Sequence, residues 1–138
     1  MWLHLARRGR QASWIHEHEA AHPIFAYVEV AELLRLTPAA FERRVLDGWA
    51  AFARRPARGG IRVIEGAFLQ LPVGVMLAMN QPAARIRALV RRIDAIVAAA
   101  DGALVYLHRP DVRRALLGTG DIRGMRWLEE MSGAVARS

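Results

Sequence analysis

The stretch Ile61-Arg62-Val63-Ile64-Glu65-Gly66 decides the fold that the sequence predicts. Three of its first four residues are β-branched, and it follows the pair Gly59-Gly60. These features predict a strand over residues 61–64 that ends at Glu65-Gly66. Helical patterns lie on both sides of it, and a strand between two helices is typical of an α/β protein.

Two further segments predict strands. Residues 12–17 are short and bounded by polar residues, and residues 103–107 form a continuous apolar run, as expected for a strand covered on both faces. Strands that alternate with helices indicate a parallel sheet with right-handed crossovers. We therefore expect one α/β domain over residues 1–138, with a parallel sheet between helices on both sides.

The helices are predicted from their starts and their apolar faces. Thr37 is expected to cap a helix that begins at Pro38 and ends before Pro56, and Pro82 is expected to begin the longest helix, which Asp101-Gly102 ends. Other helices are expected at residues 2–8, 29–36, 72–79 and 110–117, and from about Gly124, with a loop at residues 118–121.

Composition excludes several classes of function. The 138 residues contain no cysteine, which excludes disulfide scaffolds, thiol catalysis and cysteine-bound zinc. All 20 basic residues are arginine, which excludes lysine Schiff bases and any phosphate loop that uses its own lysine. The net charge is +7, but the arginines are scattered, so a nucleic-acid partner is not expected. No segment resembles a leader or a membrane span, and we expect a cytoplasmic protein.

Two acidic residues follow predicted strands. Glu65 ends the strand at residues 61–64, and Glu17 ends the strand that starts at residue 12. In open α/β sheets, ligands bind beside the carboxyl ends of the strands, and a carboxylate there can hold magnesium. The sequence therefore predicts that Glu17 and Glu65 face one cleft, with Glu65 as the tentative magnesium ligand; otherwise Glu65 is an exposed turn residue.

The segment His18-Glu19-Ala20-Ala21-His22 has the H-E-x-x-H pattern of zinc proteases. That chemistry needs both histidines on one continuous helix. Pro23 follows His22 and disfavours a helical conformation there. A histidine-rich loop is therefore preferred to a zinc hydrolase, which stays an open alternative.

A third candidate is the segment Asp121-Ile122-Arg123-Gly124-Met125-Arg126. Arg123 and Arg126 could clamp a phosphate by bidentate, charge-assisted hydrogen bonds. The alternative is a solvated basic turn at the start of a helix.

Taken in order, several segments resemble P-loop nucleoside and nucleotide kinases, near thymidylate and deoxynucleoside kinases. Residues 5–17 are similar to the helix after the phosphate loop and the second strand, followed by His22-Pro23. Residues 64–70 are similar to the third strand and its acidic end. Residues 104–107, Pro110-Asp111-Val112 and residues 123–127 are similar to the fourth strand and an arginine-bearing lid.

The resemblance implies a three-layer αβα sheet of the P-loop NTPase type, ATP and Mg²⁺ as cofactors, and a small hydroxyl acceptor such as a nucleoside or nucleotide. It implies that Glu17 activates the acceptor hydroxyl, that Glu65 lies near magnesium, and that the lid-like segment 118–127 neutralises the transferred phosphoryl group. The implied catalytic residues are Glu17, Glu65, Arg123 and Arg126, and the implied substrate-binding residues are His22, Phe68 and Gln70.

The sequence departs from these kinases at its start. The G-x-x-x-x-G-K-[ST] loop is absent, so on this resemblance the chain begins after the central strand and the phosphate loop. We therefore expect weak ATP binding and little or no turnover, and an open sheet that favours a homodimer. The main alternative is a non-catalytic basic module that binds nucleic acid or a protein.

Overall fold

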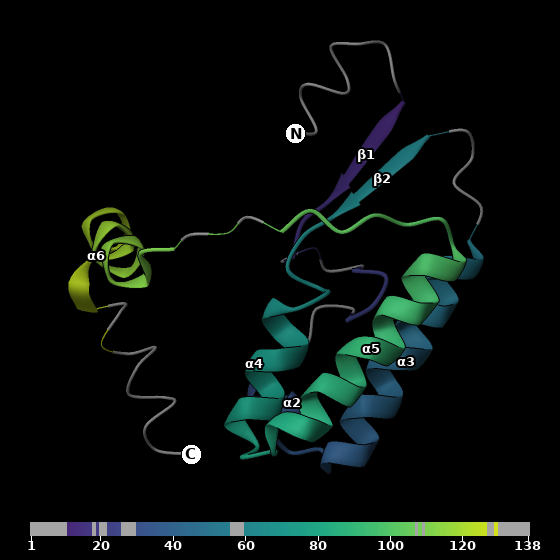
Figure 1. The fold of residues 1–138 in the computed structure, drawn as a ribbon, viewed down its shortest axis with the longest axis horizontal. Coiled ribbons are helices and arrows are strands. Elements are labelled where there is room, and N and C mark those ends of the chain that lie inside the picture. Colours follow the sequence, from purple (N-terminus) through teal and green to yellow (C-terminus); the bar gives the residue numbers. More distant parts are fainter. Residues whose placement is uncertain are drawn as a thin grey trace. The chain divides into compact units, whose positions relative to one another are not determined.

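A computed structural model shows a mixed α/β protein with five helices and a two-stranded parallel sheet in its described part (Figure 1). The chain divides into two compact units, residues 1–102 and residues 103–138, and each is described by itself. The prediction of a single domain over residues 1–138 stays a prediction. The structure describes residues 11–17, 19, 22–25, 30–55, 60–106, 108, 110–126 and 129.

The sheet consists of β1 (Ala12–Ile15) and β2 (Ile61–Ile64), which run parallel with Ala12 opposite Ile61 and Ile15 opposite Ile64. Two of the predicted strands and their parallel direction are thus confirmed. Paired residues of a parallel sheet place their side chains on the same face. Ile64 packs against the hydrophobic core, so this face of the sheet is the one that the helices cover.

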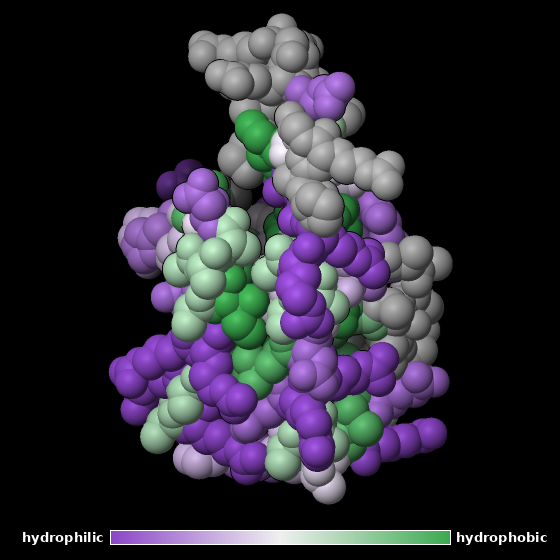
Figure 2. Space-filling view, turned by 90° about the vertical axis from the view of Figure 1, so that its right-hand side faces the viewer, coloured by the Kyte–Doolittle hydropathy of each residue, from purple (hydrophilic) through white to green (hydrophobic). Residues whose placement is uncertain are grey.

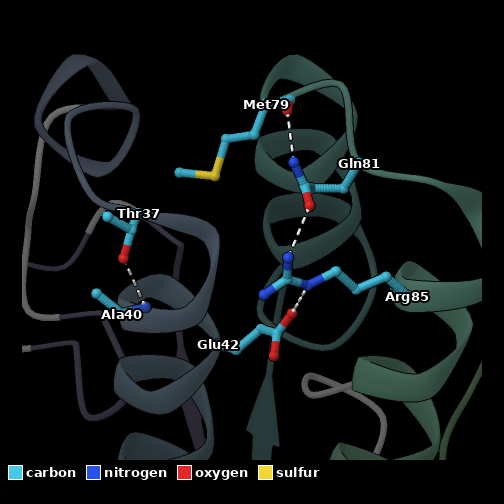
Figure 3. A network of polar contacts seen from close by, with 6 residues as sticks. All are labelled: Thr37, Ala40, Glu42, Met79, Gln81 and Arg85. Atoms are coloured by element: carbon cyan, nitrogen blue, oxygen red, sulfur yellow. Dashed lines mark hydrogen bonds and ion pairs between the residues drawn. The ribbon is translucent and has the colours of Figure 1, made fainter.

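Helix α3 (Pro38–Arg54) begins where the sequence predicts it. The Thr37 hydroxyl accepts a hydrogen bond from the backbone N–H of Ala40, as Figure 3 shows, and Pro38 occupies the first turn, where no N–H is needed. The apolar residues of this helix recur on one face, and that face is buried. It consists of Phe41, Val45, Leu46 and Trp49.

Helix α5 (Ala83–Ala99) lies beside α3, and α4 (Gln70–Ala78) packs against α5 (Figure 1). The short α2 (Val30–Leu33) precedes α3 and buries Leu33. Helix α5 ends in a Schellman motif, in which Gly102 N–H donates to Val97 O and Asp101 adopts a φ of 54°. The predicted stop at Asp101-Gly102 is thereby confirmed.

Polar contacts join the starts of α3 and α5 (Figure 3). The Arg85 guanidinium donates to Glu42 Oε1 from its Nε and to Gln81 Oε1 from its Nη1. The Gln81 amide in turn donates to Met79 O. Figure 2 shows the outer face of these helices, where hydrophilic side chains surround a narrower set of hydrophobic ones.

The predicted strand at residues 103–107 is wrong over its described part. Residues 103–106 form no regular structure, and the side chains of Leu104, Val105 and Tyr106 are 50%, 58% and 67% exposed. A continuous apolar run shows that a segment tends to be buried, but a strand also needs a hydrogen-bonding neighbour, which these residues lack in the described part of the chain. The described part of the sheet therefore has two strands, not three.

The predicted loop at residues 118–121 is also wrong, because α6 (Val112–Arg123) continues through it. Asp111 caps the helix by accepting a hydrogen bond from Arg114 N–H, and the helix ends at Gly124, whose φ is 91°. Gly118 and Gly120 lower the helix propensity but do not stop a helix that is well capped. Trp127, in the predicted lid-like segment 118–127, lies outside the described residues.

Among the residues that the structure describes, no helix is both long enough and apolar enough to cross a lipid bilayer. The predicted helix at residues 2–8 falls outside the described ranges.

Candidate functional site at the carboxyl end of the sheet

Glu17 and Glu65 lie at the same edge of the sheet. Each follows one of two neighbouring parallel strands, so the ends of both strands point the same way. The backbone continues this pairing past the strands, because Glu65 N–H donates to Ile15 O at 3.2 Å. The structure therefore brings these two sequence-predicted residues to one edge.

The Glu17 carboxylate lies against the start of α4. Its Oε2 accepts a hydrogen bond from the Gln70 side-chain amide at 3.2 Å. Gly66 makes this approach possible, because a Cβ at that position would lie 2.6 Å from Glu17 Oε2. Gly66 also has a φ of 72°, in the region that glycine adopts without strain. Gln70, predicted as a substrate-binding residue, is thus placed beside Glu17.

The Glu65 carboxylate has a different neighbour. Its Oε2 lies 3.9 Å from His16 Nε2, and the two side chains are 48% and 42% exposed. The His16 ring makes an edge-to-face contact with Trp14, at 5.2 Å between centroids. Because side chains alternate along a strand, Trp14 and His16 share one face with Glu65, and Glu17 shares the other with Gly66. The two carboxylates therefore lie on opposite faces of the sheet at this edge and contact different side chains, so the strands do not direct them into the one cleft predicted from the sequence.

A turn after β1 holds His16 in place. The Glu19 carboxylate accepts from His16 N–H at 3.0 Å, and Glu19 N–H donates to His16 O at 3.1 Å. His22 N–H then donates to Glu19 O at 2.9 Å. Glu19 therefore satisfies the backbone of the turn, which is a structural role.

His22 is a buried structural residue, with 3% of its surface exposed. Its Nδ1 accepts hydrogen bonds from the backbone N–H groups of Ile24 and Phe25, at 3.3 and 3.1 Å, and the ring stacks on Phe25. Burial lowers the pKa of His22, and the nearby Glu19 offsets part of this shift. Because Nδ1 accepts these hydrogen bonds, the proton of the neutral ring lies on Nε2.

This arrangement bears on the zinc hypothesis. Nδ1 of His22 is already used by two N–H donors, and the residue lies in a turn, not in a helix that would continue through His18. His18 lies outside the described residues. Within the part of the chain that is described, no three potential metal-ligating side chains gather.

Phe68, predicted to bind substrate, is partly buried against the core. Its ring makes an edge-to-face contact with Trp49, at 5.9 Å between centroids. The indole N–H of Trp49 is buried, and no described residue accepts a hydrogen bond from it. Phe68 therefore connects the loop after Glu65 to the helical core.

Arg123 and Arg126 belong to the second unit. Arg123 is the last residue of α6, Arg126 follows Gly124, and both side chains are exposed. Their predicted role in neutralising the transferred phosphoryl group stays a prediction.

At the sheet edge, Glu65 is the one described carboxylate placed to bind magnesium, so the protein would supply few of the ligands. Mg²⁺ prefers oxygen ligands, keeps several waters and is bound by one or two carboxylates together with phosphate oxygens. Glu65 can supply one such carboxylate, since its side chain is about half exposed. The Glu17 carboxylate already accepts from Gln70.

Sequence reasoning missed His16 as the neighbour of Glu65. The signal was present in the two-residue alternation that places Trp14 and His16 on one face of β1, but its use requires the register of β1 against β2. Comparisons of the chain with protein-family models, with curated proteins and with solved structures found no match.

Proposed function

We propose that the chain is a kinase-like phosphotransferase domain, which transfers a phosphoryl group from ATP to a small hydroxyl acceptor such as a nucleoside or nucleotide. The observation that supports it is the position of Glu17 and Glu65 at the carboxyl edge of two parallel strands. This edge is where ligands bind in open α/β sheets. The proposal includes a three-layer P-loop arrangement, of which β1 and β2 would be two strands.

Each carboxylate has a separate task in this proposal. Glu17 accepts the proton of the acceptor hydroxyl while the hydroxyl oxygen bonds to the γ-phosphorus, and the bond to the bridging oxygen breaks so that ADP leaves. The hydrogen bond from Gln70 orients the Glu17 carboxylate for this step. Glu65 would hold magnesium, which neutralises charge on the phosphates when it is bound.

In this proposal the Glu17 carboxylate, which accepts from Gln70, and the Glu65 carboxylate, which lies beside His16, serve different groups of the reactants. Arg123 and Arg126 would stabilise the transferred phosphoryl group. Since the 138 residues contain no lysine and no phosphate-loop pattern, this chain is expected to bind ATP weakly and to turn over slowly.

The experiment is NMR titration of the chain with Mg²⁺–ADP and, separately, with nucleosides. We expect shift changes confined to residues 16–19 and 65–70 at millimolar ligand. Glu65→Gln should abolish the Mg²⁺ dependence, and Glu17→Gln should weaken the response to nucleosides. Asp94→Asn, an exposed acid on α5, is the matched control and should change neither.

Two results would contradict the proposal. One is the absence of any shift change at the sheet edge. The other is a response spread over the arginines that weakens steeply with salt, which would indicate a basic module that binds nucleic acid. Tight, Mg²⁺-dependent ATP binding would contradict the expectation that the phosphate cradle is lacking.

A further inference from the structure

The outer edge of β2 carries backbone groups that pair with no other residue that the structure describes. Ile61 N–H donates to Gln11 O at 2.8 Å, and Glu65 N–H donates to Ile15 O at 3.2 Å, so the odd-numbered residues of this stretch bond to β1. Backbone groups alternate in direction along a strand, and those of Arg62 and Ile64 therefore point away from β1. None of the described residues bonds to them from that side.

Within the described ranges, nothing gives this edge the usual protection against pairing with another chain. Edge strands are commonly protected by charged side chains, prolines or bulges. The one charged residue of β2 is Arg62, and its guanidinium group turns inward, where it lies 4.1 Å from the centre of the Phe52 ring and donates to Phe52 O at 3.3 Å. Its charge is therefore held by α3 and does not shield the edge.

The sheet also exposes apolar side chains. Trp14 and Ile61, on the face away from the core, are 47% and 43% exposed. Parallel sheets are normally covered on both faces, and two strands alone are marginally stable in water. Exposed apolar groups beside an unpaired edge indicate a surface that pairs with another strand.

We propose that β2 pairs antiparallel with β2 of a second copy of this chain, around a two-fold axis at Val63. In this register Arg62 and Ile64 of one copy exchange N–H···O bonds with Ile64 and Arg62 of the other. All outward-facing groups of both strands are then satisfied. The sheets of the two copies become one continuous sheet.

The side chains favour a second copy as the occupant. In this register Arg62 lies opposite Ile64, Val63 opposite Val63, and Ile61 opposite Glu65, so no two like charges face each other. A two-fold dimer uses the same surface on both subunits, so the strand edge must form hydrogen bonds with an identical edge. Two-fold symmetry is the commonest symmetry of homo-oligomers. One short strand buries far less than the roughly 1,000 Å² of a stable interface, so the dimer is expected to be weak and concentration-dependent.

The first test is amide hydrogen exchange at low and high protein concentration. We expect the amides of Arg62 and Ile64 to become protected as the concentration rises, whereas the amide of Ile61 stays protected throughout because it already bonds to Gln11. Fast exchange of both amides at every concentration would overturn the proposal. Protection in a dilute monomer would also overturn it, because a strand of the same chain would then occupy the edge.

The second test uses the position that faces itself. Val63→Glu and Val63→Lys should each weaken the dimer about tenfold in sedimentation equilibrium, since like charges meet at the axis. An equimolar mixture of the two variants should restore association as a mixed dimer, which also shows that both variants fold. Val63→Thr, the uncharged control, should dimerise as the unchanged protein does. If neither Val63→Glu nor Val63→Lys changed the dimer affinity, the interface would lie elsewhere and the proposal would be wrong.

Discussion

The helices and the sheet of the first unit differ in how they are stabilised. Helices α3, α4 and α5 enclose side chains with no exposed surface, among them Phe41, Met76 and Ile93. No residue of the two strands is fully buried, and Trp14 and Ile61 are nearly half exposed. The packing of the helices therefore supplies most of the free energy of unfolding. The sheet contributes less, and the candidate functional residues lie in the loops that follow its strands.

This difference teaches that the candidate site and the core can be changed separately. His16, Glu17 and Glu65 lie at the end of the sheet, and each contacts at least one other side chain of that region. Substitutions in the helical layer should lower stability, while those at the sheet edge should alter binding at a small cost in stability.

The largest effect is expected for Phe41→Ala in α3. Phe41 is completely buried, and its loss leaves a cavity that the packed helices cannot fill. We expect the free energy of unfolding to fall by about 3–5 kcal/mol in urea denaturation. Arg44→Ala, on the exposed side of the same helix, is the control and should change it by less than about 0.5 kcal/mol. Equal losses would show that the helical layer is not the stable part.

His22→Ala tests the contact between the turn after β1 and the core. The substitution leaves the N–H groups of Ile24 and Phe25 without an acceptor in a buried place. We expect a loss of about 1–3 kcal/mol in the same assay. His22→Asn offers a carbonyl oxygen near the position of Nδ1 and should lose less. If both variants lose the same amount, the hydrogen bonds to Nδ1 are not what stabilises the turn.

The pH dependence of stability should report on the same residue. Burial holds the pKa of His22 below its ordinary value of 6.5, so the unfolded chain binds more protons than the folded one at mildly acid pH. Its contribution is complete above about pH 6.5 and is lost as the pH falls through the folded pKa. Urea unfolding from pH 7.5 to 5 should show this decline, and His22→Asn should remove it. An unchanged decline in that variant would assign it to other groups.

A smaller effect is expected at the edge of the sheet. Gly66→Ala places a Cβ at a φ of 72° and against the Glu17 carboxylate, which we expect to cost about 1–2 kcal/mol and to shift the NMR signal of the Gln70 side chain. Gly74→Ala is the matched control, because Gly74 lies inside α4 with no atom near its Cβ position. That variant should raise stability by about 0.5–1 kcal/mol. Opposite signs at these two glycines would support the assigned roles.

The smallest effect is expected for the ion pair between α3 and α5. Arg85 and Glu42 are only partly buried, so their interaction is screened by solvent (Figure 3). A double-mutant cycle with Arg85→Ala and Glu42→Ala should give a coupling energy of about 0.5–1 kcal/mol. The value should fall in high salt. A coupling of several kcal/mol would show that this contact, and not apolar packing, holds the helices together.

Sequence reasoning found the residues that end the two strands, but not which side chains they contact. That Glu17 and Glu65 end two strands follows from the residues alone. The contacts of Glu17 with Gln70 and of Glu65 with His16 depend on the register of β1 against β2. His22 was predicted to bind substrate, yet its ring is enclosed by the turn that follows it, and only the folded turn shows this.

What the sequence determined by itself is the two long helices, α3 and α5, and the two short strands. Local signals predict these elements: the start of α3 at Thr37-Pro38, the apolar stripes of α3 and α5, and the β-branched residues of β2. The helices are the most predictable, because helix hydrogen bonds join residues close in sequence. Only the tertiary structure decided that residues 103–106 are not a strand and that Glu17 and Glu65 contact different side chains. The physical reason is that a strand, unlike a helix, takes its hydrogen bonds and its register from a neighbour distant in the chain.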